Sequence, residues 1–304
     1  AALADGLREV TSARAVARPA PPAETVPEVD GPETAAPPAA SIHAQATVLD
    51  AARAANTLPA PSTSFVGREQ VVAEVLDALE ASNLVTLTGP GGIGKTRLAI
   101  HAASLVVDSA PDGVWFVDLT QLAGPSGVAR AVAAGLGLRA ETDADAVVSV
   151  VRRLTHNRAL LVLDNCEHVV ADCIALLDEL VRACPNVRVL ATSRETLHVY
   201  GETVYPVPPL ALGAGGESPD DPTPGEAVRL FVARAQLVST SFQPTRDDLK
   251  EIVEICAALD GLPLAIELAA ARARILTVHQ LHERLHDRLR LLARDDATRH
   301  GSLR

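Results

Sequence analysis

A glycine-rich segment at residues 89–96 constrains this chain more than any other feature of its sequence. It reads GPGGIGKT and fits the pattern GxxxxGK[ST], between a short β-rich run at 84–88 and a helical pattern that starts near Lys95. Glycines let successive backbone N–H groups converge on phosphate oxygens, and the helix directs its positive end at them. The segment therefore predicts a phosphate-binding loop in which Lys95 reaches the β- and γ-phosphates and Thr96 ligates Mg²⁺.

Strand and helix patterns alternate on both sides of this loop. The expected strands are 84–88, 114–119, 159–163, 187–192 and 203–207, and the expected helices between them are 71–79, 95–107, 128–136, 145–154 and 169–183. This alternation predicts a three-layer α/β/α P-loop domain with a mainly parallel sheet. Only helical patterns follow, at 226–238, 247–259, 263–273 and 278–292, and they predict a small all-helical domain.

Two stretches interrupt these patterns. Residues 1–58 are rich in Ala and Pro and are predicted to be a disordered, flexible linker, with one short helix within 41–55. Pro and Gly dominate again at 208–225, where no periodicity survives. We therefore expect a linker at 1–58, a nucleotide-binding domain at 59–220 and a helical domain at 221–304.

A carboxylate follows the buried run at 159–163. Asp164 at this strand end would hold Mg²⁺ through water, together with Thr96. Asn165 comes next and cannot accept a proton at neutral pH, so a general base beside Asp164 is Glu167 or is missing. Glu167 is alternatively a solvated carboxylate at a helix start. Arg194, after the strand at 187–192, either contacts the terminal phosphate or is a surface side chain that caps a loop.

Composition excludes several functional classes. Aromatic residues make up 2% of the chain, which rules out a nucleic-acid platform built on stacking. With 27 basic and 38 acidic side chains, the net charge of −11 makes the chain alone a poor DNA binder. No apolar run approaches the ~18–20 residues of a membrane span, so we expect a cytoplasmic protein without membrane contact. The four cysteines lack metal-like spacing and are expected to be buried, reduced thiols.

Five motifs occur in an order and spacing that point to a known family. They are TSFVGRE at 63–69, the loop at 89–96, LLVLDNCEH at 160–168, LATSRETL at 190–197 and GLPLA at 261–265. Together they resemble signal-transduction ATPases with numerous domains (STAND ATPases). The resemblance is strongest to the NB-ARC-type modules of actinobacterial transcriptional regulators, both antibiotic-regulatory-protein and LuxR-type activators. It implies ATP or ADP with Mg²⁺ as ligands, Val66 and Arg68 lining the nucleotide, Arg194 sensing the terminal phosphate and Pro263 packing on adenine.

The residues expected to bind the nucleotide are Val66, Gly67, Arg68, Gly89, Pro90, Gly91, Gly92, Ile93, Gly94, Lys95, Thr96, Arg97, Asp164, Arg194, Leu262 and Pro263. Those expected to act in catalysis are Lys95, Asp164, Glu167 and Arg194, and those expected to hold Mg²⁺ are Thr96 and Asp164.

The chain begins at Ala1 and contains no Met, so we expect it to be a piece of a longer polypeptide with effector and sensor domains outside it. Three functions follow: a regulatory ATPase with slow hydrolysis, a non-hydrolysing nucleotide-exchange and self-association module, and a DNA motor, which the charge disfavours. DNA contact is expected only through the missing domains. Near the end, His279, His282 and His286 share an Arg-rich helix that is a solvated face, a basic contact or a metal site.

Overall fold

The computed structural model describes residues 56–122, 124, 126–213 and 224–287. The predicted linker and the predicted short helix at 41–55 lie outside the described residues, except for residues 56–58. Most of the loop at 208–225 and the end of the predicted helix at 278–292 also lie outside them.

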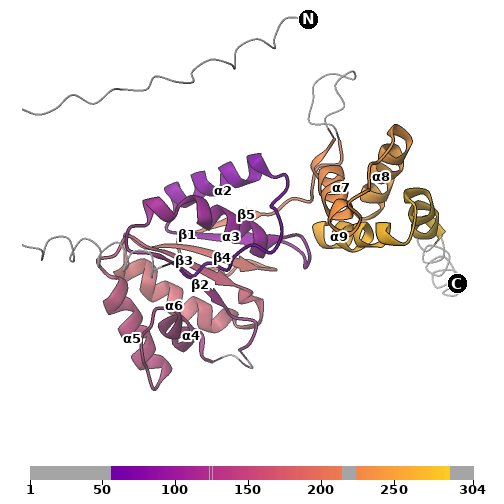
Figure 1. Cartoon of the computed structure of the whole chain (residues 1–304). Coiled ribbons are helices and arrows are strands. Elements are labelled where there is room, and N and C mark those ends of the chain that lie inside the picture. Colours follow the sequence, from indigo (N-terminus) through magenta and orange to yellow (C-terminus); the bar gives the residue numbers. More distant parts are fainter. Residues whose placement is uncertain (1–55, 123, 125, 214–223, 288–304) are drawn as a thin grey trace, which may run out of the picture. The chain divides into compact units, whose positions relative to one another are not determined.

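Five parallel strands form one sheet (Figure 1). In sheet order they are β2 (Val114–Asp118), β3 (Leu160–Asp164), β4 (Arg188–Ser193), β1 (Leu84–Thr88) and β5 (Glu202–Pro206). Every neighbouring pair is parallel, and Leu84 lies opposite both Val189 and Glu202. The parallel sheet predicted from the alternating pattern is confirmed.

Helices cover both faces of this sheet. One face carries α2 (Glu69–Ala81) and α3 (Lys95–Leu105), and the other carries α4 (Val128–Gly135), α5 (Asp143–Leu154) and α6 (Val170–Ala183). Alternate strand residues serve the two cores, since Val162 packs with α2 and α3 whereas Leu161 and Leu163 pack with the opposite layer. Because both faces are covered, the inner strands are continuous apolar runs rather than alternating ones.

The C-terminal described region is entirely helical, as predicted. It contains α7 (Glu226–Val238), α8 (Arg246–Ala258), α9 (Pro263–Ala270) and a helix over 278–287. Thr245 and Asp248 form a capping box that starts α8, and Pro263 occupies the first turn of α9, where its missing N–H costs no hydrogen bond. Phe231, Ile252 and Ile266 lie in a separate apolar core of this region.

Three short 3-10 helices were not predicted: η1 (Val107–Ser109), η2 (Cys166–His168) and η3 (Ala271–Arg274). Two of them replace the ends of helices that the periodicity extended to 107 and 273. The third follows Asn165, whose left-handed backbone, with φ 62°, turns the chain sharply after β3. The predicted helix at 169–183 therefore starts at Val170.

The parallel arrangement brings the carboxyl ends of all five strands to one edge of the sheet. Thr88, Asp118, Asp164 and Ser193 are the last residues of four of these strands. Loops at this edge are where ligands of open parallel sheets bind. The glycine loop, Asp164 and Arg194 are consequently neighbours, although Asp164 comes 68 residues after Thr96 of the loop.

Candidate functional site

The glycine loop joins β1 to α3, as the sequence predicts. Gly89, Gly92 and Gly94 have φ angles of 146°, 80° and 91°, which residues with a Cβ rarely adopt. Gly94 is also the N-cap residue directly before α3, so the helix N-terminus with its unpaired N–H groups faces the loop. The segment has the backbone form of an anion cradle.

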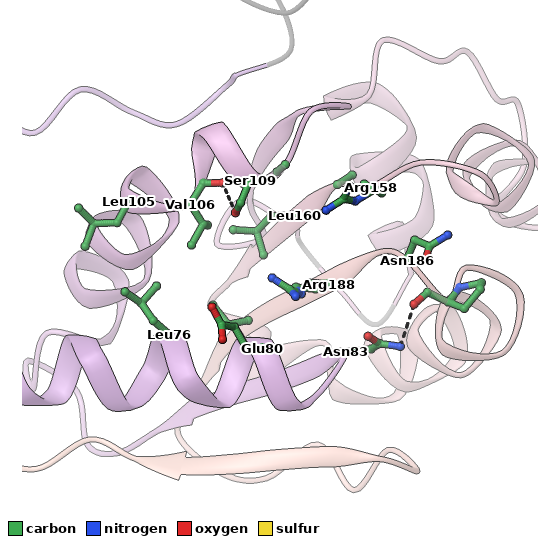
Figure 2. Close-up of a pocket in the computed structure, with 14 residues that line it drawn as sticks. Leu76, Glu80, Asn83, Leu105, Val106, Ser109, Arg158, Leu160, Asn186 and Arg188 are labelled. Carbon is green, nitrogen blue, oxygen red and sulfur yellow. Dashed lines mark hydrogen bonds between the residues drawn. The ribbon is translucent and has the colours of Figure 1, made fainter.

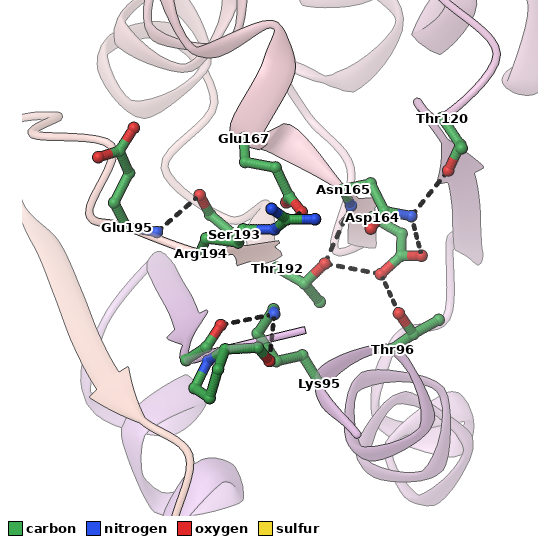
Figure 3. Close-up of polar contacts among 12 residues, drawn as sticks. Lys95, Thr96, Thr120, Asp164, Asn165, Glu167, Thr192, Ser193, Arg194 and Glu195 are labelled. Atoms are coloured by element: carbon green, nitrogen blue, oxygen red, sulfur yellow. Dashed lines mark hydrogen bonds and ion pairs between the residues drawn. The ribbon is translucent and has the colours of Figure 1, made fainter. Parts of the chain in front are cut away.

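Lys95 lies inside this cradle. Its side chain is buried, and its Nζ donates to the carbonyl oxygens of Gly89, at 2.7 Å, and Pro90, at 3.2 Å (Figure 3). Burial lowers the pKa of Lys95, and the negative charge of Glu167 partly offsets the effect. The ammonium group is thus fixed at the loop, where it can compensate phosphate charge.

Asp164 is the centre of a hydroxyl network beside the loop. Its Oδ1 accepts hydrogen bonds from Thr96 at 2.8 Å and from Thr192 at 2.6 Å, and its Oδ2 accepts one from Asn165 at 3.0 Å (Figure 3). Burial raises the pKa of Asp164, with opposing contributions from the two threonine hydrogen bonds. Thr96 and Asp164 bring together a hydroxyl and a carboxylate, the hard oxygen ligands that suit Mg²⁺.

Asp118 is a neighbour of Asp164 that the sequence interpretation missed. The last residue of β2 lies directly opposite the last residue of β3 in the sheet register. Asp118 is exposed and accepts hydrogen bonds from the N–H and hydroxyl of Thr120, while Asn165 donates to the same hydroxyl over 2.7 Å. Burial raises the pKa of Asp118, but hydrogen bonds from Thr120 and Asn165 outweigh it and lower the pKa overall. An apolar strand followed by Asp, the pattern that identified Asp164, could have found it.

Glu167 and Arg194, both expected to act in catalysis, form an ion pair. Arg194 Nε lies 3.1 Å from Glu167 Oε1, and the side chains are 68% and 19% exposed (Figure 3). The second oxygen of Glu167, Oε2, is buried without a hydrogen-bond partner among the described residues. A buried acceptor without a donor is costly, so this carboxylate is suited to take a further donor at the site.

Arg68 lies under the glycine loop. Its side chain is buried, and Nη2 donates to the carbonyl oxygens of Ile93, at 2.7 Å, and Pro208, at 2.8 Å. Its backbone N–H donates to Glu226 of α7, and a Cβ at Gly67 would approach the side chain of the same glutamate to 2.9 Å. Gly67 and Arg68 therefore connect the loop to the helical region. The guanidinium group of Arg68 also stabilises the loop through its hydrogen bond to Ile93.

Arg97 does not point into the glycine loop. Its guanidinium donates to Glu267 of α9, at 3.0 Å, and to the carbonyl oxygens of Thr63 and Ser64. Arg234 of α7 donates to the same glutamate oxygen at 2.8 Å and to Ser64 at 2.8 Å. One carboxylate thus joins α3, α7 and α9. Sequence reasoning missed Glu267, because nothing in its local pattern distinguishes it from a surface glutamate.

The start of α9 touches the loop directly. The N–H of Leu264 donates to the carbonyl oxygen of Gly92 over 3.2 Å. Val66, Arg68, Gly94 and Pro263 line one narrow cavity of about 30 Å³, so several residues expected around the nucleotide do lie together. Leu262 packs at the edge of the core that contains α2 and α3 and contributes no side-chain hydrogen bond.

The roomier cavities lie elsewhere. One of about 620 Å³ opens at the amino ends of the strands, opposite the glycine loop, and Glu80, Asn83, Arg158 and Arg188 surround its mouth (Figure 2). It shares no residue with the loop network. Another, of about 800 Å³, lies between residues 56–65 and α3. Size alone therefore does not identify the candidate site, which is defined by its donor groups.

Two of the histidines near the end of the described chain lie beside glutamates of α8. His279 lies 2.8 Å from Glu251, and His282 lies 2.9 Å from Glu254. No group of three or more His, Cys, Asp or Glu side chains suited to a metal occurs among the described residues. The four cysteines are buried and free, as expected.

Comparison with known protein families agrees with the parallel-sheet fold and its glycine loop. A family profile described as an AAA domain matches residues 78–199. The chain thus carries a parallel-sheet P-loop ATPase fold of the AAA type, followed by an all-helical region. No described helix has the length and apolarity that crossing a membrane requires.

Two curated relatives are regulators by name. A Mycobacterium tuberculosis protein, Rv0890c, is provisionally named an HTH-type transcriptional regulator; it is 42% identical over 217 residues, which cover 71% of this chain and 23% of the relative. The regulatory protein AfsR of Streptomyces griseus is 32% identical over 254 residues, covering 77% of this chain and 24% of AfsR. The chain thus spans about a quarter of the length of each.

Among solved structures, a STAND protein with a tetratricopeptide repeat sensor from Pyrococcus horikoshii is similar in fold. Its TM-score is 0.49 at 19% sequence identity, with 76% of this chain and 33% of that chain covered.

Proposed function

We propose that this chain is a nucleotide-binding module that switches a transcriptional regulator between states as ATP and ADP exchange in the glycine loop. The observation that carries the proposal is the contact between Thr96 and Asp164, at 2.8 Å, beside the buried ammonium group of Lys95. A fixed cation, a ring of loop N–H groups and a hydroxyl–carboxylate pair together suit a nucleoside polyphosphate with Mg²⁺.

Each part of the site has a task in this proposal. The loop at 89–94 and Lys95 would bind the phosphates, while Thr96 and Asp164 would hold Mg²⁺, which neutralises phosphate charge when bound. Val66, Arg68, Leu262 and Pro263 would surround the base. Arg97 would act indirectly, because its guanidinium group is occupied by Glu267 and by carbonyl oxygens.

The switch would work through the contacts that link the loop to the helical region. The N–H of Leu264 donates to the carbonyl oxygen of Gly92. Glu267 accepts a hydrogen bond from Arg97, which comes only two residues after Lys95. A change in the loop on phosphate binding would therefore shift the position of α9 relative to the loop. Arg194 is exposed beside Lys95 and Asp164. It would sense the terminal phosphate by leaving Glu167 and binding the phosphate instead.

Hydrolysis in this module would be slow. Asn165 cannot accept a proton, and Arg194 already engages one oxygen of Glu167, the base expected from the sequence. We expect turnover well below the ~1–10³ s⁻¹ of typical enzymes. The test is release of phosphate from ATP by the full chain with Mg²⁺, compared with Asp164→Asn. Fast turnover would contradict a slow switch.

A second candidate is a non-hydrolysing exchange and self-association module. The ion pair between Arg194 and Glu167 favours it, because one oxygen of the base expected from the sequence is already engaged. Phosphate release equal to that of Asp164→Asn, with intact ADP and ATP binding, would favour this second function. In either case we propose a cytoplasmic STAND-class module of the NB-ARC type within a longer regulator. Its effector and sensor domains would lie in the rest of the polypeptide, with DNA contacted only through them.

A further inference from the structure

Asp118 ends the strand next to Asp164. β2 and β3 are parallel neighbours, and the register pairs these two aspartates directly. Both therefore emerge at the same edge of the sheet, the edge that carries the glycine loop. The two strands also share one pattern, an apolar run that ends in Asp.

The two carboxylates differ in what they already bind. Asp164 is buried, and its oxygens accept hydrogen bonds from Thr96, Thr192 and Asn165. Asp118 is exposed, and its Oδ1 accepts hydrogen bonds from the N–H and the hydroxyl of Thr120. The neighbouring strand thus presents an exposed carboxylate at this edge of the sheet.

Asn165 connects these two groups. Its Nδ2 lies 2.7 Å from the Thr120 hydroxyl and 3.0 Å from Asp164 Oδ2. The amide therefore bridges the ends of β2 and β3 and separates two negative charges.

We propose that Asp118 is a positioning residue of the nucleotide site, where its carboxylate accepts hydrogen bonds from water in the coordination shell of the nucleotide-bound Mg²⁺. The inference rests on the proposed function, because it requires a metal–nucleotide complex in the loop. Mg²⁺ keeps several waters in proteins and is commonly bound by one or two carboxylates together with phosphates. Asp164 is one such carboxylate, and Asp118 provides the second.

The test is a titration of Mg²⁺ into the full chain in the presence of ADP. The quantity measured is the increase in ADP affinity as the Mg²⁺ concentration rises. Asp118→Asn keeps an oxygen for the Thr120 N–H, so the turn is retained while the charge is lost. We expect the Mg²⁺ concentration for half-maximal enhancement to rise about five- to tenfold, because hydrogen bonds to a charged acceptor are stronger. ADP affinity without metal should stay within about twofold.

Two further variants separate charge from structure. Asp172→Asn removes one negative charge from the first turn of α6 and should titrate like the unchanged chain. Asp118→Glu keeps the charge and should lie closer to the unchanged chain than Asp118→Asn does. Equal losses in Asp118→Asn and Asp118→Glu, or none in Asp118→Asn, would overturn the role of Asp118. If the unchanged chain bound no ADP, the proposed function itself would fail, which is a separate result.

Discussion

Arg97 of α3 donates to Glu267 of α9 over 3.0 Å, and this contact ties the helix that begins at the glycine loop to the helical region. Arg97 is only two residues beyond Lys95, so a shift of the loop would move Arg97 and change its contact with Glu267. Arg234, whose side chain is 7% exposed, shares the same carboxylate oxygen. One glutamate carboxylate is therefore the charged partner of two guanidinium groups.

Glu267→Gln should lower the free energy of unfolding by about 1–3 kcal/mol, because it leaves the buried Arg234 without a charged partner. If Arg97 acts through this glutamate, the Arg97→Gln, Glu267→Gln double variant should lose less than the sum of the single variants. Urea unfolding measures all three. The exposed pair of Lys250 and Asp247 is the matched control, and its neutralisation should leave the urea midpoint of unfolding nearly unchanged. Strict additivity at Arg97 and Glu267 would contradict the coupling.

Arg194→Ala should weaken binding of a non-hydrolysable ATP analogue by about tenfold and leave ADP affinity nearly unchanged, because ADP lacks the group that Arg194 would contact. Fluorescence competition with both nucleotides measures the ratio. Equal losses for ADP and the analogue would exclude terminal-phosphate sensing.

Glu167→Gln addresses the other member of this ion pair. The variant frees Arg194 without removing it, so binding of the ATP analogue should hold or improve. Phosphate release should fall further if Glu167 is the base. Unchanged release in Glu167→Gln would make the residue a partner of Arg194 only.

His279 gives the helix over 278–287 a pH-dependent contact with α8. The hydrogen bond with Glu251 raises the pKa of His279, and Glu283, 3.6 Å away, adds to the effect. A raised histidine pKa stabilises the fold below the unfolded-state pKa, and the contribution disappears as the pH rises through the folded-state value. Glu251→Gln should therefore lower Tm more at about pH 6 than at about pH 9. A pH-independent difference in Tm would contradict this contact.

Much of the fold could be predicted from the sequence because the main strand and helix signals of the described residues agree with the final structure. The inner strands are short apolar runs buried on both faces, and the helices have amphipathic spacing, so element type and order were right. The glycine loop and the Asp164 strand end were recognisable because their chemistry requires particular residues at fixed positions.

Contacts that arise only from tertiary packing could not be predicted. Glu267 and Arg234 look like ordinary helix residues, and only the fold places both beside Arg97. The pairing of Glu167 with Arg194 likewise depends on β3 and β4 being neighbours. Asp118 is different, because its signal was present in the sequence and needed only the strand order to give it meaning.

The most direct test of the account is isothermal titration of the full chain with ADP, with and without Mg²⁺. The chain has two lysines, Lys95 in the glycine loop and Lys250 on the surface of α8, so each can be replaced by alanine as a matched pair. We expect saturable ADP binding that Mg²⁺ strengthens, at least about tenfold weaker in Lys95→Ala, which corresponds to about 1.4 kcal/mol, and unchanged in Lys250→Ala. No ADP binding by the unchanged chain, or equal affinity in Lys95→Ala, would contradict the nucleotide site.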